Sequence, residues 1–340
     1  MKKTQVALAA LALVASTAVL ADGVTVYGSA DGSVISGGGR TAFDGGGGYS
    51  TSLLGVRGSE DLGGGLKASF NLETGVNLGN GGTGGGGGGN TGLFNRAANV
   101  SLGNDSVSIT LGNTFSVAVA GMFGGATAGA GDNVNVPAVV RMFGGNPGIV
   151  LHANTFGGLS GFFIPDALTV RASAGGLTLS AQTRITENGP TNTGYRAFNI
   201  SGSADVVNFA IGGQQSTGLT EISGDNYRTM FVSANTKIGD IGLNGAYARN
   251  SGLVTGSTYM AGASYPLSEA AAIGAIYARG IAGDNQTSLN VKYSLSKSTV
   301  AYATISRFAI EGGTGNYSNT NNGGLTGVSQ AFSAGISHSF

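Results

Sequence analysis

Apolar and polar residues alternate along most of the chain, most strictly in the stretch Gly55–Gly75, which reads GVRGSEDLGGGLKASFNLETG. The apolar positions of its second half are Leu66, Ala68, Phe70 and Leu72. The polar positions between them are Lys67, Ser69, Asn71 and Glu73. This period of two predicts a β-strand with one apolar face. Such a face packs into the core of a soluble β-sandwich but faces lipid in a membrane barrel, so the pattern alone leaves two architectures open.

The same alternation predicts further strands, separated by segments rich in turn-forming residues. The clearest of these strands lie at 107–112, 168–173, 177–184, 207–212, 288–295 and 328–340. No segment has a convincing helical period, so we expect an all-β chain.

The connections between the strands alternate in length. Short connections contain compact turn sequences such as SEDLGGG, SAGG and KIGD. The longer ones lie near 36–49, 77–92, 114–166, 216–224 and 309–327. Short turns at one end of every hairpin and longer loops at the other are typical of a transmembrane antiparallel β-barrel of the outer membrane. Counting the segments gives about 16 strands, and barrels of this kind have an even number.

The first residues, MKKTQVALAALALVASTAVLADG, have the order of a secretory signal peptide. Two lysines precede an apolar run from Val6 to Leu20, and small residues lead up to Ala21. The run is short for a membrane helix, which needs roughly 20 apolar residues. We therefore expect residues 1–21 to be a signal peptide and residues 22–340 to form a single barrel domain in the outer membrane.

Composition narrows the picture further. The chain has 64 glycines among 340 residues, 41% hydrophobic residues and only 10% charged residues, which argues against disorder. Without the two lysines of the leader, 17 − 2 = 15 basic residues stand against 17 acidic ones, which gives no sign of nucleic-acid binding. Cysteine and tryptophan are absent. We therefore expect no disulfides, and we expect aromatic girdles built from residues such as Tyr265, Tyr277, Tyr293, Phe332 and Phe340.

Several stretches resemble the general Gram-negative porins, in the branch typical of β-proteobacteria. Besides the stretch from Gly55 to Gly75, they are VTVYGSAD at 24–31, LFNRAANVSL at 93–102, VSITLGN at 107–113 and AGISHSF at 334–340. The last ends in Phe340, the terminal aromatic residue that barrels of this family present to their assembly machinery. The fragments follow the family order and span most of the chain.

The resemblance implies a 16-stranded barrel, usually a homotrimer, whose third external loop folds inward to narrow a pore. In this sequence that constriction loop is residues 113–166, which contain Phe123, Asp132, Arg141 and Asp166. A Met-Phe-Gly-Gly unit occurs twice in it, and the first copy resembles a family element. The alternative is that Phe123 and Phe143 only fasten a glycine-rich loop to the barrel wall.

Candidate pore-lining residues follow from the parity of the strands. The polar face is expected to carry Tyr27, Asp31, Arg57, Lys67, Asn71, Glu73, Arg171 and Arg184. The resemblance adds Arg96, which belongs to a basic cluster on the wall in the family, although strict alternation places it on the lipid side unless a bulge or a position near the rim intervenes. The family often has arginine where this chain has Leu53 and Asn113, so we expect a pore that is weakly anion-preferring or nearly non-selective.

Catalysis and metal binding find little support in the residues. The two histidines, His152 and His338, and the absence of cysteine do not provide a typical zinc site, and no nucleophile, base and orienting group are grouped in sequence. We therefore expect no enzyme activity and no cofactor. The expected function is passive diffusion of small hydrophilic solutes and ions, with a substrate-specific channel or a surface β-rich adhesin as alternatives.

Overall fold

The computed structural model describes residues 23–45, 48–83, 92–127, 162–185, 194–217, 227–252, 255–279, 285–309 and 329–340. The predicted signal peptide at 1–21 lies outside these residues, as do Asp132 and Arg141 of the predicted constriction loop.

Within the described residues the chain forms seventeen strand segments and one helix, α2 (Val117–Thr127). The strands are β1 (Thr25–Gly37), β2 (Arg40–Asp44), β3 (Leu53–Gly63), β4 (Leu66–Gly75), β5 (Ala97–Gly103), β6 (Val107–Phe115), β7 (Phe163–Ala174), β8 (Leu177–Arg184), β9 (Gly194–Ala204), β10 (Val207–Thr217), β11 (Tyr227–Ile238), β12 (Ile241–Gly252), β13 (Gly256–Pro266), β14 (Ala271–Arg279), β15 (Asn285–Ser294), β16 (Thr299–Ala309) and β17 (Gln330–Ser339).

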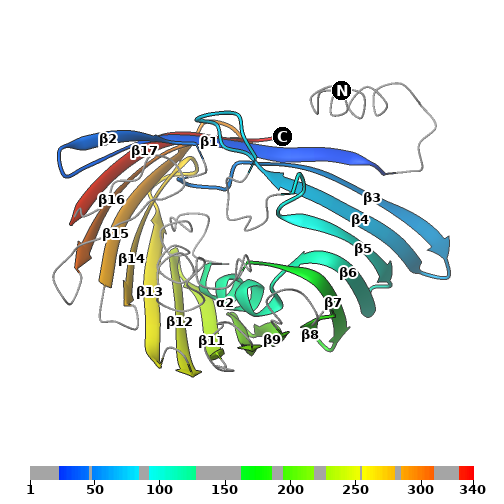
Figure 1. The fold of residues 1–340 in the computed structure, drawn as a ribbon. Coiled ribbons are helices and arrows are strands. Elements are labelled where there is room, and N and C mark those ends of the chain that lie inside the picture. The colour runs from blue at the N-terminus through cyan, green and yellow to red at the C-terminus, as the bar shows by residue number, and fades with distance from the viewer. Residues whose placement is uncertain are drawn as a thin grey trace.

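All of these strands belong to one antiparallel sheet, which closes on itself because β17 pairs with β1 (Figure 1). β2 and β3 lie one after the other along the same side of β1: residues 40–44 pair with 37–33, and residues 53–57 pair with 29–25. The seventeen described segments therefore occupy 17 − 1 = 16 positions around the barrel. The predicted fold class and strand count are confirmed.

One end of the barrel carries only short turns among the described connections. Gly64 and Gly65 join β3 to β4, and Gly175 and Gly176 join β7 to β8. All four have a positive φ, between 58° and 81°, which glycine adopts without steric cost and which a two-residue hairpin turn requires. The carboxy terminus lies at this end, where the backbones of Phe340 and Gly28 exchange two hydrogen bonds of 3.0 Å. The longer connections lie at the opposite end, which is the external end of an outer-membrane barrel.

The two faces of the wall differ in polarity as the alternation predicts. On β4, Asn71 and Glu73 contact the hydroxyl of Tyr27 on the inner side, and Leu66 points the other way and is exposed. The outer surface continues with exposed apolar residues on the neighbouring strands, including Val100 and Ile109. Because every second residue of a strand shares a face, the apolar set of the opening stretch forms the outer, lipid-facing surface.

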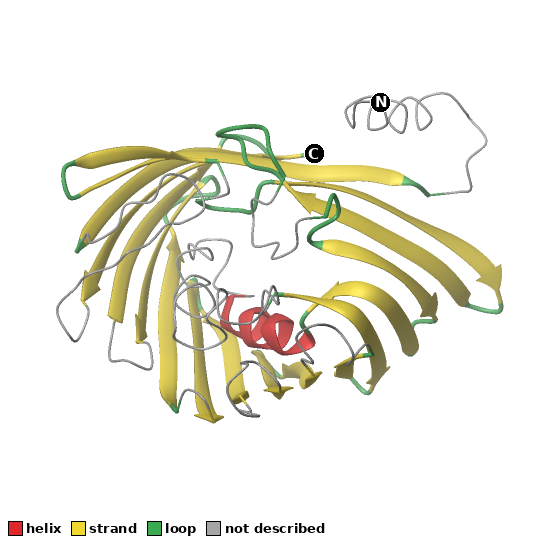
Figure 2. Cartoon of the chain, viewed as in Figure 1, coloured by secondary structure: helices red, strands yellow, loops and turns green. Residues whose placement is uncertain are grey.

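The helix α2 lies inside the barrel, against the inner surface of β8–β12 (Figure 2). It is apolar on all sides, and Val117, Val119 and Met122 are almost completely buried. The wall beneath it presents small side chains, which let the helix approach closely: Ala197, Ala210, Ala246 and Ala248. The expectation of an all-β chain missed this helix because a helix that is apolar all round has no amphipathic period.

Within the described part of the chain, no helix is both long enough and apolar enough to cross a bilayer.

Candidate functional site

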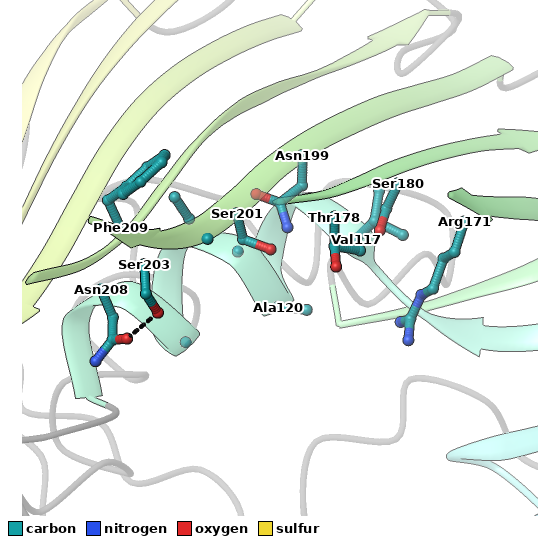
Figure 3. Close-up of a pocket in the computed structure, with 14 residues that line it drawn as sticks. Val117, Ala120, Arg171, Thr178, Ser180, Asn199, Ser201, Ser203, Asn208 and Phe209 are labelled. Carbon is teal, nitrogen blue, oxygen red and sulfur yellow. Dashed lines mark hydrogen bonds between the residues drawn. The ribbon is translucent and has the colours of Figure 1, made fainter. Parts of the chain in front are cut away.

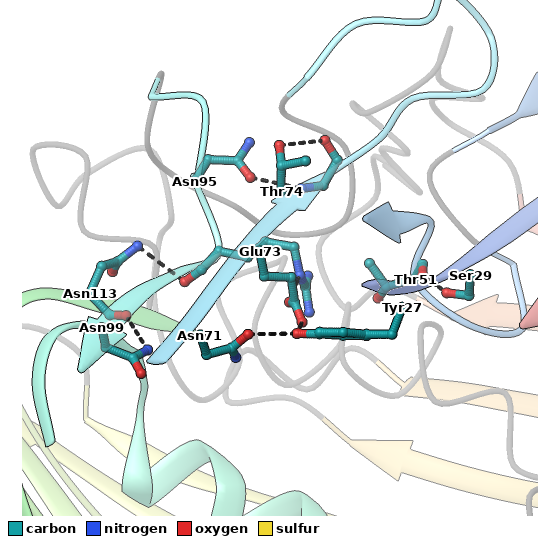
Figure 4. Close-up of polar contacts among 11 residues, drawn as sticks. Tyr27, Ser29, Thr51, Asn71, Glu73, Thr74, Asn95, Asn99 and Asn113 are labelled. Atoms are coloured by element: carbon teal, nitrogen blue, oxygen red, sulfur yellow. Dashed lines mark hydrogen bonds and ion pairs between the residues drawn. The ribbon is translucent and has the colours of Figure 1, made fainter. Parts of the chain in front are cut away.

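The inner wall carries a cluster of polar residues on β1, β3 and β4. The hydroxyl of Tyr27 lies 2.8 Å from Oδ1 of Asn71 and 2.9 Å from Oε2 of Glu73 (Figure 4). Both oxygens are acceptors for its hydrogen. The guanidinium carbon of Arg57 lies 4.9 Å from the centre of the Tyr27 ring, in a cation–π contact. Four residues predicted to line the interior therefore lie together on one part of the wall.

Arg96 joins this cluster from outside the strands. Its Nε forms a close ion pair with Oε1 of Glu73, and its guanidinium lies 4.8 Å from the centre of the Phe163 ring. The side chains of Arg96 and Glu73 are each 13% exposed. Because β5 begins at Ala97, strand alternation does not apply to Arg96. The conflict between its parity and its family position disappears for that reason, and no bulge is required.

Three asparagines hold the backbone around Arg96. Nδ2 of Asn113 donates to the carbonyl of Arg96 at 3.1 Å, and Nδ2 of Asn99 donates to the carbonyl of Asn113 at 3.0 Å. The backbone N–H of Gly75 donates to Oδ1 of Asn95 at 2.8 Å (Figure 4). Asn113, at which the resemblance implied an arginine, therefore supports the backbone of Arg96.

Asp31 differs from the prediction that it lines the pore. It lies on the inner face of β1 but is completely buried beneath residues 48–50. Its carboxylate accepts hydrogen bonds from the backbone N–H groups of Gly48 at 2.8 Å and Ser50 at 2.8 Å, and from the hydroxyl of Tyr302 at 2.6 Å. A buried carboxylate requires such donors, and here they come from a segment that folds over it. Asp31 therefore fastens this segment to the wall and contacts no solvent.

The interruption between β2 and β3 lies beside Asp31. There the hydroxyl of Ser52 accepts a hydrogen bond from the backbone N–H of Asp31 at 2.9 Å and donates to its carbonyl at 3.0 Å. One serine side chain thus satisfies both backbone groups that a continuous neighbouring strand normally pairs.

Two further basic residues lie on β7 and β8. Arg184 on β8 is opposite Ala167 on β7. Its Nη2 lies 3.7 Å from Oδ2 of Asp166, near the beginning of β7. Asp166 has a φ of 53°, in the left-handed region, and its side chain is 53% exposed, so this ion pair is partly solvated. Arg171 is opposite Ser180 on the inner face and is exposed.

A polar network fastens the start of α2 to the wall. Ser116 precedes the helix, and its hydroxyl accepts from the N–H of Val119 at 3.2 Å, as an N-cap does. The same hydroxyl lies 2.7 Å from the hydroxyl of Tyr195 on β9. Gln182 on β8 accepts from the N–H of Val117 at 3.2 Å and donates to the hydroxyl of Thr114 at 2.6 Å. These contacts satisfy the helix N-terminus inside the barrel.

Phe123, predicted in the constriction loop, is buried on α2. Its ring stacks with Phe162, with 6.2 Å between the ring centres. This ring contact joins two residues of the predicted loop, so both interpretations of Phe123 stay predictions. The second Met-Phe-Gly-Gly unit, which contains Arg141, lies outside the described residues.

A cavity of 420 Å³ lies between α2 and the inner face of β7–β10 (Figure 3). Its lining is mixed, with the polar side chains of Thr178, Ser180 and Asn199 on the strands, and Arg171 is its charged residue among those described. Asn199 is only 7% exposed, and its Oδ1 has no hydrogen-bond partner within the described residues. The cavity therefore offers one positive charge and several small hydrogen-bonding groups.

Lys67 lies on the inner face near a short turn, opposite Asp61. Two more lysines share the inner face, although they were not among the predicted site residues. Lys292 lies between the buried Ala272 and Tyr302, and Lys237 is opposite Gly242 near the short-turn end. The parity of residues 288–295 already assigns Lys292 to the polar side, whereas Lys237 lies in a part of the sequence where the alternation is weak.

Comparisons with known proteins agree with this architecture. Residues 7–313 match the family model described as Gram-negative porin. The outer membrane porin protein 32 of Delftia acidovorans is 42% identical over 118 residues, which span 33% of this chain and 31% of that protein. The matched stretch is thus about a third of the relative's length.

Solved structures resemble the whole barrel. An anion-selective porin from Comamonas acidovorans superimposes with a TM-score of 0.70 at 20% identity, covering 93% of this chain and 99% of that one. OmpF of Salmonella typhi, in complex with daunomycin, gives a TM-score of 0.67 at 14% identity, covering 93% and 97%. OmpT of Vibrio cholerae, in a trimer form, gives 0.64 at 12%, covering 93% and 99%. At these identities the structures show a shared fold, and the family match covers most of the chain. The chain belongs to the Gram-negative porin family, whose members are channels, and it crosses the outer membrane as a β-barrel.

Proposed function

We propose that the chain forms a water-filled pore for passive diffusion of small hydrophilic solutes and ions, with a weak preference for anions. The observation that carries the proposal is the unequal exposure of charges on the inner wall. The basic residues on the described inner face include Arg57, Lys67, Arg96, Arg171, Arg184, Lys237 and Lys292. Of the acidic residues that accompany them, Asp31, Asp44 and Glu73 are withdrawn from solvent, whereas Asp61, opposite Lys67, is exposed.

The carboxylates lose their influence on the pore in two ways. Asp31 and Asp44 are buried, with exposures of 0% and 1%. Glu73 is paired with Arg96 and accepts from Tyr27. A passing ion therefore meets solvated guanidinium and ammonium groups, above all Arg57 and Arg171, which favour anions in a confined pore where screening is incomplete.

The preference is expected to be weak because several basic groups are themselves neutralised. Arg96 and Arg184 are in ion pairs, and Leu53 and Asn113 occupy positions that carry arginine in many porins. The anion-selective porin of Comamonas acidovorans shares the barrel, which is consistent with this assignment.

The test is the zero-current potential of the reconstituted protein in a planar bilayer that separates two KCl concentrations. We expect stepwise single-channel conductance and a potential whose sign corresponds to a modest excess of chloride over potassium permeability. A clear preference for potassium would contradict the charge assignment, and a complete absence of conductance steps would contradict the pore.

A substrate-specific channel is the second candidate, because the cavity beside α2 offers a localised site with Arg171 and Asn199. A specific channel has a saturable site, so a solute held there reduces ion conductance along a saturating curve, whereas a general pore shows no saturation. The adhesin alternative has no observation in its favour.

For assembly we propose a homotrimer, as in the trimer form of the Vibrio cholerae barrel. Light scattering of the detergent-extracted protein, corrected for bound detergent, tests this. The full chain has a mass of 33.4 kDa, and we expect a mass near three times that of the chain without its predicted leader. A mass near one chain would overturn it.

A further inference from the structure

The cavity between α2 and the wall is built around one row of inward-facing residues. Arg171 on β7 is opposite Ser180 on β8, and Ser180 is opposite Asn199 on β9. Neighbouring strands lie about 4.8 Å apart, so the backbones of Arg171 and Asn199 are separated by about 10 Å. The side chains of this row follow one another along the cavity in Figure 3. The row therefore presents, in order, a guanidinium, a hydroxyl and an amide.

Both ends of this row carry a polar group without a partner among the described residues. No ion pair joins Arg171 to a described carboxylate, and the residue is exposed. Asn199 is buried, and its Oδ1 accepts no hydrogen bond from a described group. A buried acceptor without a donor is unfavourable, so a donor that binds at Oδ1 is stabilised there. A ligand with an anionic group at one end and a donor at the other satisfies both.

The side chains of α2 do not supply the missing donor. Gly121 faces Asn199, and a Cβ added there would overlap the amide. The other residues of the helix that line the cavity are Val117, Ala120 and Gly124, whose side chains have no polar atoms. α2 therefore contributes apolar surface that suits a carbon skeleton, and the wall contributes the polar groups.

A second row of hydroxyl groups lies one inward-facing position nearer the short-turn end. Thr178 on β8 is opposite Ser201 on β9, and both line the cavity. Ser203 lies two residues further along β9, and its hydroxyl donates to Oδ1 of Asn208 at 2.6 Å (Figure 3). Because a hydroxyl both donates and accepts, this row matches the hydroxyl groups of a ligand in more than one orientation.

Solvent reaches the cavity from the short-turn end, which is the periplasmic end of an outer-membrane barrel. Ser203 and Asn208 lie at that end and are exposed. At the opposite end Gln182 and Tyr195 are each 4% exposed and hold the start of α2 against the wall. The cavity is therefore closed on its external side. None of its described lining residues belongs to the cluster around Tyr27.

These groups select a small anion that carries hydroxyl groups. An ionised carboxylate pairs with Arg171 but has only acceptors, so it does not satisfy Oδ1 of Asn199. An ammonium group donates, but no carboxylate lines the described part of the cavity to balance its charge. A hydroxyl group on the anion is the donor that remains. One guanidinium balances one negative charge, which favours a carboxylate over a phosphate group that carries about two.

We propose that the cavity beside α2 is a binding subsite for a small polyhydroxylated carboxylate, a sugar acid. Its carboxylate pairs with Arg171, and its hydroxyl groups bond to Ser180 and Asn199. The inference deepens the second candidate function, and it rests on the proposed pore because a solute reaches this cavity through the lumen.

The test measures the binding of gluconate to the full barrel in detergent by saturation-transfer NMR, with protein-free micelles as the blank. Each comparison probe lacks one of the two features: glucitol has the hydroxyl groups without the charge, and butyrate has the charge without hydroxyl groups. Arg171→Gln removes the cation, and Asn199→Ala removes the buried acceptor. Arg196→Gln is the control, because it removes the same charge from the outer face of β9.

We expect gluconate to bind along a saturating curve, and glucitol and butyrate to bind at least several-fold more weakly. The affinity for gluconate should fall several-fold in Arg171→Gln and in Asn199→Ala, and should stay unchanged in Arg196→Gln. Equal affinities for gluconate and butyrate would show that binding follows charge alone and would overturn the proposal. An unchanged affinity for gluconate in Arg171→Gln would overturn it as well.

The conductance of the same preparations in a planar bilayer separates this inference from the proposed pore. Conducting barrels that bind no gluconate overturn the subsite and leave the pore intact, whereas the absence of conductance steps overturns the pore. If Asn199→Ala does not fold, or conducts differently because α2 has moved, Ser180→Ala tests the same row. It should weaken the binding of gluconate and leave that of butyrate unchanged, and full affinity for gluconate would contradict the proposal.

Discussion

At the scale of single residues, burial decides which charges on the inner wall influence a passing ion. Asp31 is covered and held by backbone N–H groups and the Tyr302 hydroxyl, whereas Arg171 is exposed beside the cavity. Both are inward-facing residues of strands, so parity treats them alike. Their different roles follow from what folds over them: residues 48–50 lie over Asp31.

Removing the charge of Arg171 should weaken the preference for anions. A unit charge a few Å from an ion in water contributes about 1 kcal/mol or less, so Arg171→Gln is expected to lower the chloride-to-potassium permeability ratio by up to about fivefold. The zero-current potential measures this ratio. Arg196→Gln is the matched control, because the same charge is lost from the outer face of the wall. An equal effect of both variants would contradict a role for Arg171 inside the lumen.

Asp31→Asn should loosen the segment that folds over it. An asparagine presents one acceptor oxygen and directs an NH₂ group at donors, so buried hydrogen bonds are lost at a cost of about 1–3 kcal/mol. We expect the folded barrel to convert to the unfolded form at a lower temperature in detergent, seen as the loss of the faster-migrating band in gel electrophoresis. Asp105→Asn, in an exposed turn, should leave this temperature unchanged.

At the scale of elements, α2 depends on close contact with the wall at one residue. A Cβ added at Gly121 would overlap the side chain of Asn199 on β9, whereas one added at Gly124 meets nothing within 4 Å. The carbonyl of Gly121 also accepts a hydrogen bond from Ser233 at 3.0 Å. Both glycines line the cavity, but Gly121 lies against Asn199 and Gly124 faces open space, so their environments differ although they are three residues apart.

This difference predicts opposite outcomes for one substitution. Gly121→Val should displace α2 from the wall and change the single-channel conductance, while Gly124→Val, with the same change in helix propensity, should leave the conductance close to that of the natural sequence. Adding Asn199→Ala to Gly121→Val removes the overlap and should restore much of the original conductance. A failure of Gly121→Val to alter conductance would show that the helix position does not determine the width of the pore.

The elements also show how far the sequence could predict this protein. Strict alternation in residues 66–73 and 107–112 predicted strands that the structure confirms, and the glycine turns predicted the end with short connections. α2 was missed because small apolar residues such as Ala118 and Ala120 give no period. The wall position of Arg96 came from family resemblance, since its parity pointed outward. The burial of Asp31 could not be predicted, because residues 48–50, which cover it, have no periodic pattern that indicates where they lie.

At the scale of the whole molecule, closure of the sheet joins the first strand, β1, to the last strand, β17, and to Phe340. Gly28 and Phe340 exchange two backbone hydrogen bonds, and the Phe340 ring packs on Gly28, where an added Cβ would lie 2.7 Å from Cζ. A closed sheet leaves no edge strand, so the last residue contributes to a ladder that involves the first strand.

Removal of Phe340 should therefore reduce the yield of closed barrel. The deletion eliminates both the two backbone bonds and the ring contact, while Phe340→Ala eliminates only the ring contact, so we expect a larger loss of heat-modifiable protein from the deletion than from the substitution. Phe332→Ala changes an exposed phenylalanine of β17 at the other end of its ladder with β1, far from the contact between Phe340 and Gly28, and should fold normally. Full yield from the deletion would show that closure does not require the terminal residue.

Ser52, which bonds to the backbone of Asp31 at the break between β2 and β3, affects how the strands of the wall separate. Elsewhere around the barrel, neighbouring strands protect each other's amide hydrogens with long ladders of backbone bonds. At Asp31 one ladder is replaced by a side-chain hydroxyl, which rotates without disturbing any strand. Amide exchange in this part of the wall needs residues 48–50 to lift and the Ser52 side chain to rotate, but no pair of strands to separate, so deuterium should enter around Asp31 earlier than at matched depths in β11 or β12. Within the described part of the wall, this break is thus a place where separation of the strands can begin.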